Sequence, residues 1–498
     1  MTSSKRPRCR PSLSALLLCL SMNAAVARDE TGPAGALTGE SISSAPTGFF
    51  PVEQDDIRPA DQLTLDVFGR PLVIGGELEF APDWEINPEL DNDEEDEVMT
   101  GEESLALEFL YRLSPRWALF LKTEVFSEDT WDVDNDRDRE SQFGMSREQH
   151  WLFVQHLFDT PFSVQIGRQN VTEKREWWWD QDLDGIRVHY EVANLHAELM
   201  LAEEVGAIDT AEGFDPQERD IRRWLGQLKW QWAERHRLEL FFLDQADHSR
   251  HELVGRVIDR DDEDPIDGDL RWWGLRQSGS FKIPHTGRFY YWLDTAAVEG
   301  DSVSYDYEDA GRDRSRVDAA RAQSVSGWAF DAGLIWRTKL PRKPTLTISL
   351  AAGSGDGSPD SGDSHAFIPT GLNGNNGKYR GVNRFRYYGE FLRPELSNLA
   401  VGTLAVGRPI LENSSVELIY HRYRQLHAAD RLFDAKVDTD PSGRSADIGD
   451  ALDLAIGVEE SAHFEFEFIL GAFRAGRAFD REEGKVAGTV QFKVNFNF

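Results

Sequence analysis

The regular alternation of apolar and polar residues at the end of the chain constrains its fold more than any other feature. In residues 486–498, Val or Phe occupies positions 486, 490, 492, 494, 496 and 498, and the residues between them include Lys493, Asn495 and Asn497. Successive side chains of a β-strand point to opposite faces, so this segment has one apolar and one polar face. Such a strand suits lipid on one side and water on the other, and the alternative is the closing strand of a soluble sandwich.

The same alternation recurs along the chain with turn residues between the segments. Residues 105–111 and 117–125 flank Ser114-Pro115-Arg116, and further segments are 224–232, 238–242, 289–297, 328–336, 346–352, 416–420 and 452–458. Their second face includes Glu108, Lys122 and Glu124, which would be costly against lipid and are ordinary on a wet lumen wall. No later stretch approaches the roughly 18 apolar residues of a membrane helix. We therefore predict an all-β fold, a transmembrane antiparallel β-barrel of 16–20 strands, with short periplasmic turns and long extracellular loops.

The first 27 residues carry a different signal. Lys5, Arg6, Arg8 and Arg10 precede an apolar stretch at 13–20, and Ala25-Val26-Ala27 matches a cleavage site. We predict a signal peptide at 1–27, a poorly ordered segment at 28–61, and the barrel at 62–498. This organisation predicts the outer membrane of a Gram-negative bacterium, with lipid and lipopolysaccharide around the barrel. Phe498 resembles the terminal signal that the barrel-assembly machinery recognises during biogenesis.

The charge balance limits the partners. The chain has 88 acidic and 54 basic residues, a formal charge of −34, and removal of the four basic residues of the signal peptide makes it −38. Nucleic acid is excluded as a partner, because phosphate binding requires a basic surface. Both cysteines, Cys9 and Cys19, lie in the removed segment. Much of the excess lies at 83–103, 128–140 and 259–269, which we interpret as solvated loops, with divalent-cation sites as the alternative.

One acidic stretch fits the calcium-loop formula. Asp180, Asp182, Asp184, Gly185 and Glu191 occupy its key positions. The residues from 186 to 190 alternate as in a strand, however, and not as in an exiting helix. We therefore predict no metal and no cofactor, and keep loop-bound Ca²⁺ as an alternative.

Basic residues form complementary clusters. Arg384 and Arg386 alternate with Phe385 and Tyr387, which predicts a strand with both guanidinium groups on one face, and Arg393 follows. A second group surrounds Gly167 and consists of Arg147, Arg168, Lys174 and Arg175. Several guanidinium groups in one lumen would form a track for a polyanion, and the alternative is ordinary salt bridging inside the barrel. Arg168 shares the parity of Ile166, so it faces the lumen only if Gly167 introduces a bulge.

These residues resemble a known family, the alginate export outer-membrane proteins. The resemblance rests on short stretches in a fixed order: Arg147-Glu148, Gly167-Arg168-Gln169 with the Trp-rich segment up to Asp180, residues 352–355, residues 370–372, residues 384–399 and residues 447–454. It implies a barrel of about 18 strands that secretes the polyuronate alginate through an arginine-rich constriction. The matching positions are Arg147, Glu148, Arg168, Asp180, Arg384 and Arg393. Two departures concern residues 464–468, whose inward positions are acidic, and the preceding connection, which is shortened to about 459–463.

The resulting hypothesis is an anion-selective channel that exports an anionic polysaccharide, alginate or a related polyuronate, with periplasmic export components as further partners. Its pore-lining residues would be Arg147, Glu148, Arg168, Arg175, Asp180, Arg384, Arg386 and Arg393. The first alternative is an uptake porin for small organic anions or oligosaccharides. The second is a secreted β-rich enzyme that degrades polysaccharides, but the chain has no Ser-His-Asp, zinc or nucleotide motif, so we predict that it is not an enzyme.

Overall fold

A computed structural model describes residues 59, 61–90, 97–132, 139–211, 221–247, 253–259, 263, 266–311, 314–357 and 362–498. The predicted signal peptide and almost all of the segment predicted as poorly ordered lie outside these residues. No helix within the described part is long and apolar enough to cross a membrane.

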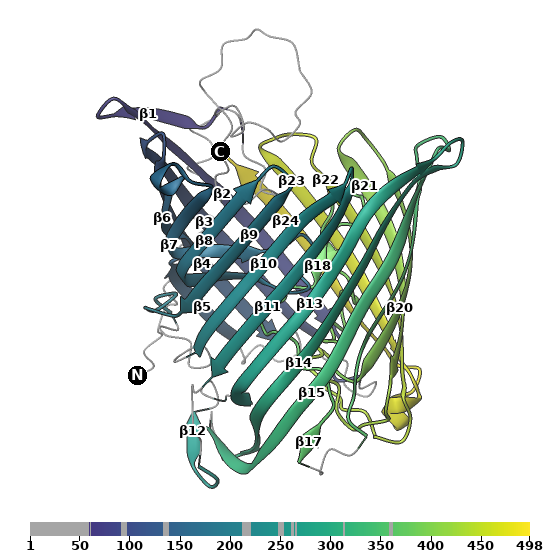
Figure 1. The fold of residues 1–498 in the computed structure, drawn as a ribbon. Coiled ribbons are helices and arrows are strands. Elements are labelled where there is room, and N and C mark those ends of the chain that lie inside the picture. Colours follow the sequence, from purple (N-terminus) through teal and green to yellow (C-terminus); the bar gives the residue numbers. More distant parts are fainter. Residues whose placement is uncertain are drawn as a thin grey trace, which may run out of the picture.

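The chain forms a closed antiparallel barrel with 18 strand positions, as the sequence predicts (Figure 1). One position is shared by two short strands, β5 and β6, which both pair with β4. The strands of the wall are β2 (Arg70–Ile86), β3 (Glu97–Ser114), β4 (Trp117–Asp132), β5 (Arg139–Ser146), β6 (His150–Val154), β7 (Phe162–Thr172), β8 (Asp180–Val192), β9 (Leu195–Glu203), β10 (Ile221–Ala233), β11 (His236–Asp247), β13 (Ile266–Ile283), β14 (Gly287–Asp309), β15 (Arg314–Thr338), β16 (Thr345–Gly353), β20 (Leu399–Pro409), β21 (Ser414–Gln425), β22 (Asp447–Val458), β23 (Phe464–Ala475) and β24 (Val486–Asn497).

Seven further elements of the described residues lie outside this wall, five short strands and two short helices. The strands are β1 (Leu63–Val67), which extends β2 as a hairpin, β12 (Val257–Asp259) and β17 (Asp363–Ser364), which both pair with β15, and the inner pair β18 (Asn376–Gly377) and β19 (Phe385–Arg386). The first helix is η1 (Leu157–Asp159). A second short helix, η3 (Arg477–Glu482), joins β23 to β24.

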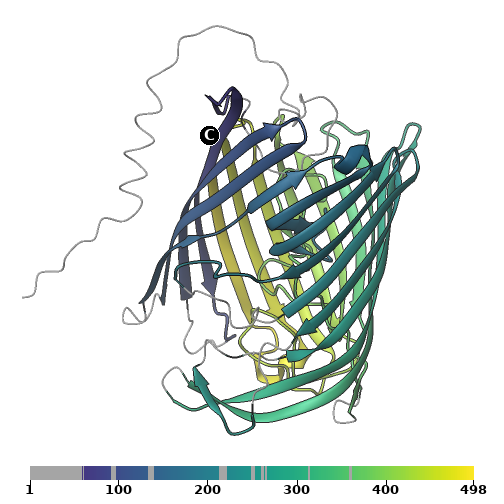
Figure 2. The same cartoon turned by 60° about the vertical axis from the view of Figure 1, so that its left-hand side comes forward.

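The last strand, β24, closes the barrel by pairing with β2, the first strand of the wall (Figure 2). Phe498 continues this pairing, because its amide and carbonyl groups both bond to Gly76 at 3.0 Å. The predicted alternation of β24 is confirmed: Val486 and Phe492 are exposed on the outside, whereas Thr489 and Asn495 are buried on the inside. The outer face therefore offers apolar side chains to lipid, and the inner face is polar.

The two ends of the barrel differ. At the end that carries β1 and the C-terminus, the wall strands are joined by turns of two to seven residues (Figure 1). The longest connection, residues 354–398, lies at the opposite end, which by this asymmetry is the extracellular one. With 23 and 25 residues, β14 and β15 exceed the roughly 10 that a bilayer requires, so their ends extend beyond it.

The prediction that three acidic segments are solvated loops is wrong in part. Residues 83–86 and 97–103 belong to β2 and β3, and the other two acidic segments also run into strand ends, so they are not simply loops. Trp177, Trp178, Trp179 and Trp272 are buried inside the barrel, where a membrane girdle cannot include them. Trp117, Trp230, Trp232 and Trp273 are exposed on the outside and fit such a girdle.

Candidate functional site

Two connections from the extracellular end fold back into the barrel. Residues 173–179 join β7 to β8, and residues 354–398 join β16 to β20. The Trp178 ring stacks on Phe241 of β11 at a centroid distance of 4.9 Å, and its carbonyl oxygen accepts a hydrogen bond from Thr370 Oγ1 at 2.6 Å. On the β21 side, the Tyr423 hydroxyl donates to the carbonyl oxygen of Tyr388 at 2.9 Å. The two connections thus contact each other, and each of them also contacts a different part of the wall.

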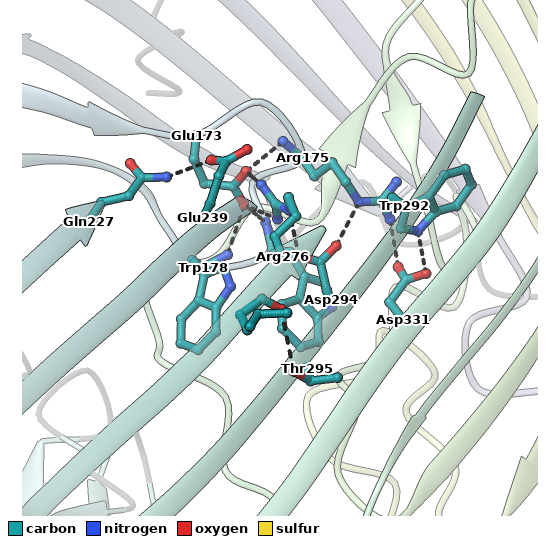
Figure 3. Close-up of polar contacts among 12 residues, drawn as sticks. Glu173, Arg175, Trp178, Gln227, Glu239, Arg276, Trp292, Asp294, Thr295 and Asp331 are labelled. Atoms are coloured by element: carbon teal, nitrogen blue, oxygen red, sulfur yellow. Dashed lines mark hydrogen bonds and ion pairs between the residues drawn. The ribbon is translucent and has the colours of Figure 1, made fainter. Parts of the chain in front are cut away.

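A buried network of charges fixes the first connection (Figure 3). Arg276 of β13 binds the Glu173 carboxylate, with Nη2 and Oε1 2.9 Å apart, and its Nε lies 2.5 Å from Asp294 Oδ1 on β14. Arg175 reaches Asp331 of β15 at 2.6 Å and Asp294 at 3.3 Å. We call these five residues, Glu173, Arg175, Arg276, Asp294 and Asp331, the interior lock.

The interior lock is built for structure and not for polymer contact. Burial opposes ionisation of Glu173, but the Arg276 guanidinium and backbone N–H donors outweigh it and lower the pKa of Glu173 to about 2. The Arg175 guanidinium lies between the rings of Trp292 and Tyr387, with its central carbon 4.3 Å from each ring centroid. Arg175 is therefore enclosed by its own protein and is not placed to meet a passing polymer.

A polar cavity of about 370 Å³ lies between the inner pair β18–β19 and the wall strands β2, β3, β4, β23 and β24. Eight of its lining residues are acidic and four are basic, so its formal charge is negative. The acidic ones are Glu77, Glu79, Glu108, Glu124, Glu176, Asp180, Glu465 and Glu467, and the basic ones are Lys122, Lys378, Arg384 and Lys493. Gln62 and Asn497, from the short-turn end, also line the cavity, which places it in the periplasmic half of the lumen.

Most basic groups of this cavity contact a carboxylate of the protein. Lys493 Nζ lies 2.5 Å from Glu79 Oε2, and Lys378 Nζ lies 3.1 Å from Glu459 Oε1. Arg384 forms an ion pair with Glu176 of the first connection. The lining is therefore a set of ion pairs with additional carboxylates, and not a row of isolated cations.

Arg384, Arg386 and Arg393 lie inside the barrel, but the strand predicted to contain both Arg384 and Arg386 contains only the second of them. Their segment belongs to the connection 354–398, and β19 contains only Phe385–Arg386, paired with β18. The backbone N–H of Arg386 donates to Glu390 Oε1 at 2.8 Å, and Arg393 Nε donates to the carbonyl oxygen of Glu390 at 2.8 Å. Arg393 also lies 3.6 Å from Asp83. Of the three arginines, Arg384 lines the cavity, as does the predicted Asp180.

Arg147, Glu148 and Arg168 form a separate group. Arg147 lies in the break between β5 and β6 and makes a two-point contact with Asp184 at 2.7 and 2.8 Å. Glu148 accepts a hydrogen bond from Ser146, and Arg168 is buried within electrostatic range of Asp182 and Asp184. Gly167 has a φ of +123°, a conformation that favours glycine, but the ladders on both sides keep their register. Arg168 is thus buried without the inserted residue of a bulge.

The calcium-loop residues lie along one extended strand. β8 contains Asp180, Asp182, Asp184 and Glu191. At about 3.3 Å per residue, Asp180 and Glu191 are roughly 35 Å apart, so this set cannot enclose one ion. Arg147 already occupies the Asp184 carboxylate. Loop-bound Ca²⁺ at the other acidic segments stays an alternative to the prediction of no metal.

Two sequence departures correspond to features of the structure. Glu465 and Glu467 point into the cavity, and the connection before β23 is limited to 459–463. The sequence prediction missed Arg276, Asp294 and Asp331. Each directly follows an apolar residue of the outer face, namely Leu275, Leu293 or Phe330, so part of the signal was present, but nothing in the sequence joins them to Glu173.

Comparison with solved structures supports the fold. The chain superposes on OpdK of Pseudomonas aeruginosa, solved with vanillate, with a TM-score of 0.51 and 11% identity, covering 85% of this chain and 98% of that one. For OpdQ of the same organism the TM-score is 0.50 at 9% identity, covering 86% and 98%. At this level of identity the likeness concerns the barrel alone.

Sequence comparison identifies the family. The alginate production protein AlgE of Pseudomonas aeruginosa is 25% identical over 345 residues, which cover 68% of this chain and 69% of that protein. AlgE of Pseudomonas syringae pv. tomato is 23% identical and covers 59% of this chain, which spans only 57% of that relative. The family model for alginate export matches residues 107–492. This outer-membrane β-barrel therefore belongs to the alginate export family.

Proposed function

We propose that the protein exports an anionic polysaccharide, alginate or a related polyuronate, through the lumen of the barrel. The observation that carries this proposal is the family match, which spans almost the whole wall, from β3 to β24. The charged cavity in the periplasmic half supports it, because a polymer leaving the periplasm would meet this part of the lumen first.

The ion pairs suggest how a polyanion could move without being trapped. A uronate carboxylate can replace Glu176 at Arg384 or Glu79 at Lys493, so one charged contact is exchanged for another. Each exchange changes the free energy little, and the displaced protein carboxylate restores the pair when the polymer advances. Several weak sites in series favour passage over retention. The excess of carboxylates also requires the polymer to enter with part of its counter-cations.

Current recording in planar bilayers tests the proposal. Oligouronate added to the periplasmic side should reduce the ion current in a concentration-dependent way, and a neutral oligosaccharide of equal length is the control. Equal effects of the two sugars, or no effect of either, would contradict recognition of uronate in the lumen. The alternative function, uptake of small organic anions, would instead give a current block by monomeric anions at similar concentrations.

The direction of transport needs a test in cells. Deletion of the gene in its own bacterium should lower polyuronate in the medium, and the wild-type gene should restore it. Unchanged secretion of polyuronate after deletion would contradict the export proposal. The periplasmic export components, lipopolysaccharide and the barrel-assembly machinery belong to the same proposal as partners. So does cleavage after Ala27, which predicts Arg28 as the first residue of the protein isolated from outer membranes.

A further inference from the structure

Three side chains with metal-binding groups meet across the hairpin of β8 and β9. His189 lies directly opposite Glu198 in the ladder of the two strands. His196 precedes Glu198 by two residues on β9, so both point to the same face. His189 and Glu198 are buried on the inner side of the barrel, whereas Val188 and Leu199 beside them are exposed on the outer side.

The spacing of the candidate donor atoms suits one small ion. Glu198 Oε2 lies 3.6 Å from His189 Nδ1 and 3.3 Å from His196 Nε2. One donor atom from each of the three residues falls within 4.8 Å of the others. Tetrahedral zinc has bonds of about 2.0–2.2 Å, so two of its ligands are roughly 3.3–3.6 Å apart. Two of the three spacings already have these values.

The donor types select the class of ion. Two imidazoles and one carboxylate suit zinc and its neighbours among the divalent transition metals, whereas calcium and magnesium prefer oxygen alone. Glu198 Oε1 is buried and accepts no hydrogen bond from the described part of the chain, so it is available to accept the hydrogen bond that Oε2 now accepts when Oε2 binds the ion. The His196 side chain is 17% exposed against 3% for His189, which leaves an open side for water as a fourth ligand.

Two cationic side chains limit the affinity of His189, His196 and Glu198 for a metal ion. Arg187 Nη2 donates to Glu198 Oε2 at 2.7 Å, and Lys229 of β10 lies opposite His196 in the next ladder. Both repel a divalent ion, and the Arg187 hydrogen bond has to move from Oε2 to Oε1 of Glu198 when the ion binds Oε2. From this geometry we infer that His189, His196 and Glu198 bind a single divalent transition metal of the zinc class, which cross-links β8 and β9 near their short turn. The inference does not depend on the polymer that the channel carries.

Metal titration of the folded protein tests the inference. Untagged protein in detergent is treated with a chelator, desalted and titrated with Co²⁺, and Zn²⁺ uptake is measured by equilibrium dialysis and elemental analysis. The wild type should bind one ion per chain, and the visible absorption of bound Co²⁺ should indicate a low coordination number. X-ray absorption of the zinc-loaded wild type should show both imidazole and oxygen ligands. A folded wild type that binds no ion, or an ion without imidazole ligands, would overturn the inference without any variant.

Variants locate the site. His189→Gln and His196→Gln should each weaken binding roughly 100-fold, since each removes a ligand. Lys229→Gln should tighten it roughly tenfold by removing a repelling charge. His150→Gln, which removes an imidazole from β6, is the matched control and should bind like the wild type. Heat-modifiable migration on gels shows that each variant is folded. Unchanged binding by the folded His189→Gln and His196→Gln variants, or equal losses in the His150→Gln control, would disprove this site.

Discussion

At the scale of single residues, burial decides what a charged group can do in this barrel. Arg175 and Arg384 belong to the same predicted arginine set, yet Arg175 is enclosed by Trp292, Tyr387 and two aspartates, whereas Arg384 lines the cavity. The sequence gives the same kind of evidence for both residues, namely an arginine that is predicted to line the pore. The difference comes from the inward connections, whose contacts a sequence does not display.

Glu390 gives a prediction about pH. Its backbone N–H donates to Asp453 Oδ2 at 3.3 Å, and burial, together with the Asp453 charge, raises the pKa of Glu390 from 4.5 to about 8. Between these pH values Glu390 keeps its proton in the folded protein and loses it in the unfolded chain. Protonated Glu390 therefore contributes its full stabilisation of the folded protein below pH 4.5, and this contribution is lost as the pH rises to about 8. Glu390→Gln keeps the neutral form at every pH. We expect the variant to resist proteolysis of residues 354–398 better than the wild type near pH 8, with little difference near pH 4.5.

The control for this experiment is Glu412→Gln, which changes an exposed carboxyl group in the turn before β21. It should leave the pH dependence of proteolysis unchanged. Parallel pH profiles for the wild type and Glu390→Gln would show that Glu390 does not keep its proton in the folded protein.

At the scale of elements, the interior lock ties residues 173–179 to β13, β14 and β15. Arg276→Met would leave Glu173 and Asp294 buried without their common cation, and breaking such a pair costs about 3–5 kcal/mol. We expect the connection to leave its position, which should give a larger and noisier single-channel conductance. Bilayer recording together with proteolysis of residues 173–179 measures both effects.

Arg271→Met is the matched control on the same strand. Arg271 is largely exposed and pairs with Asp244, so its replacement should change neither conductance nor proteolysis measurably. An unaltered conductance in a folded Arg276→Met variant would mean that the lock does not hold the connection inside the lumen.

The wall elements were predictable, and the inner elements were not. The alternation of β24 and the turn between β3 and β4 follow from local periodicity, because one face of each wall strand meets lipid. Phe385 and Tyr387 also alternate with arginines, but they pack around Tyr379 inside the barrel, so the same pattern has another cause. The length of β14 and β15 was missed because their outer ends lie in water, where lipid imposes no apolar face.

At the scale of the whole molecule, the closed wall separates two environments and the inward connections narrow the interior. The chain can therefore carry a large negative charge and still offer basic groups along its lumen, because Lys122, Lys378, Arg384 and Lys493 face the cavity. We expect assembly to depend on the wall, which β24 closes against β2, and ion selectivity to depend on the interior. Changes in the interior should thus alter selectivity without preventing assembly.

The double variant Arg384→Glu, Arg393→Glu tests this separation. Arg384 pairs with Glu176, and Arg393 lies near Asp83, so the two reversals put carboxylates next to carboxylates inside the lumen. We expect the reversal potential in a salt gradient to shift towards cation preference and the block by oligouronate to weaken about tenfold or more. Heat-modifiable migration on gels should remain as in the wild type.

Arg116→Glu together with Arg444→Glu is the control with the same change of net charge. Both arginines are exposed, in the turn before β4 and in the connection before β22, outside the narrow interior. Screening by salt should make their effect on selectivity small. If both double variants shift the reversal potential equally, selectivity follows the total charge of the protein. If only the interior variant does so, the basic groups of the lumen set it, and the paired arginines are the part of the channel that a uronate chain contacts.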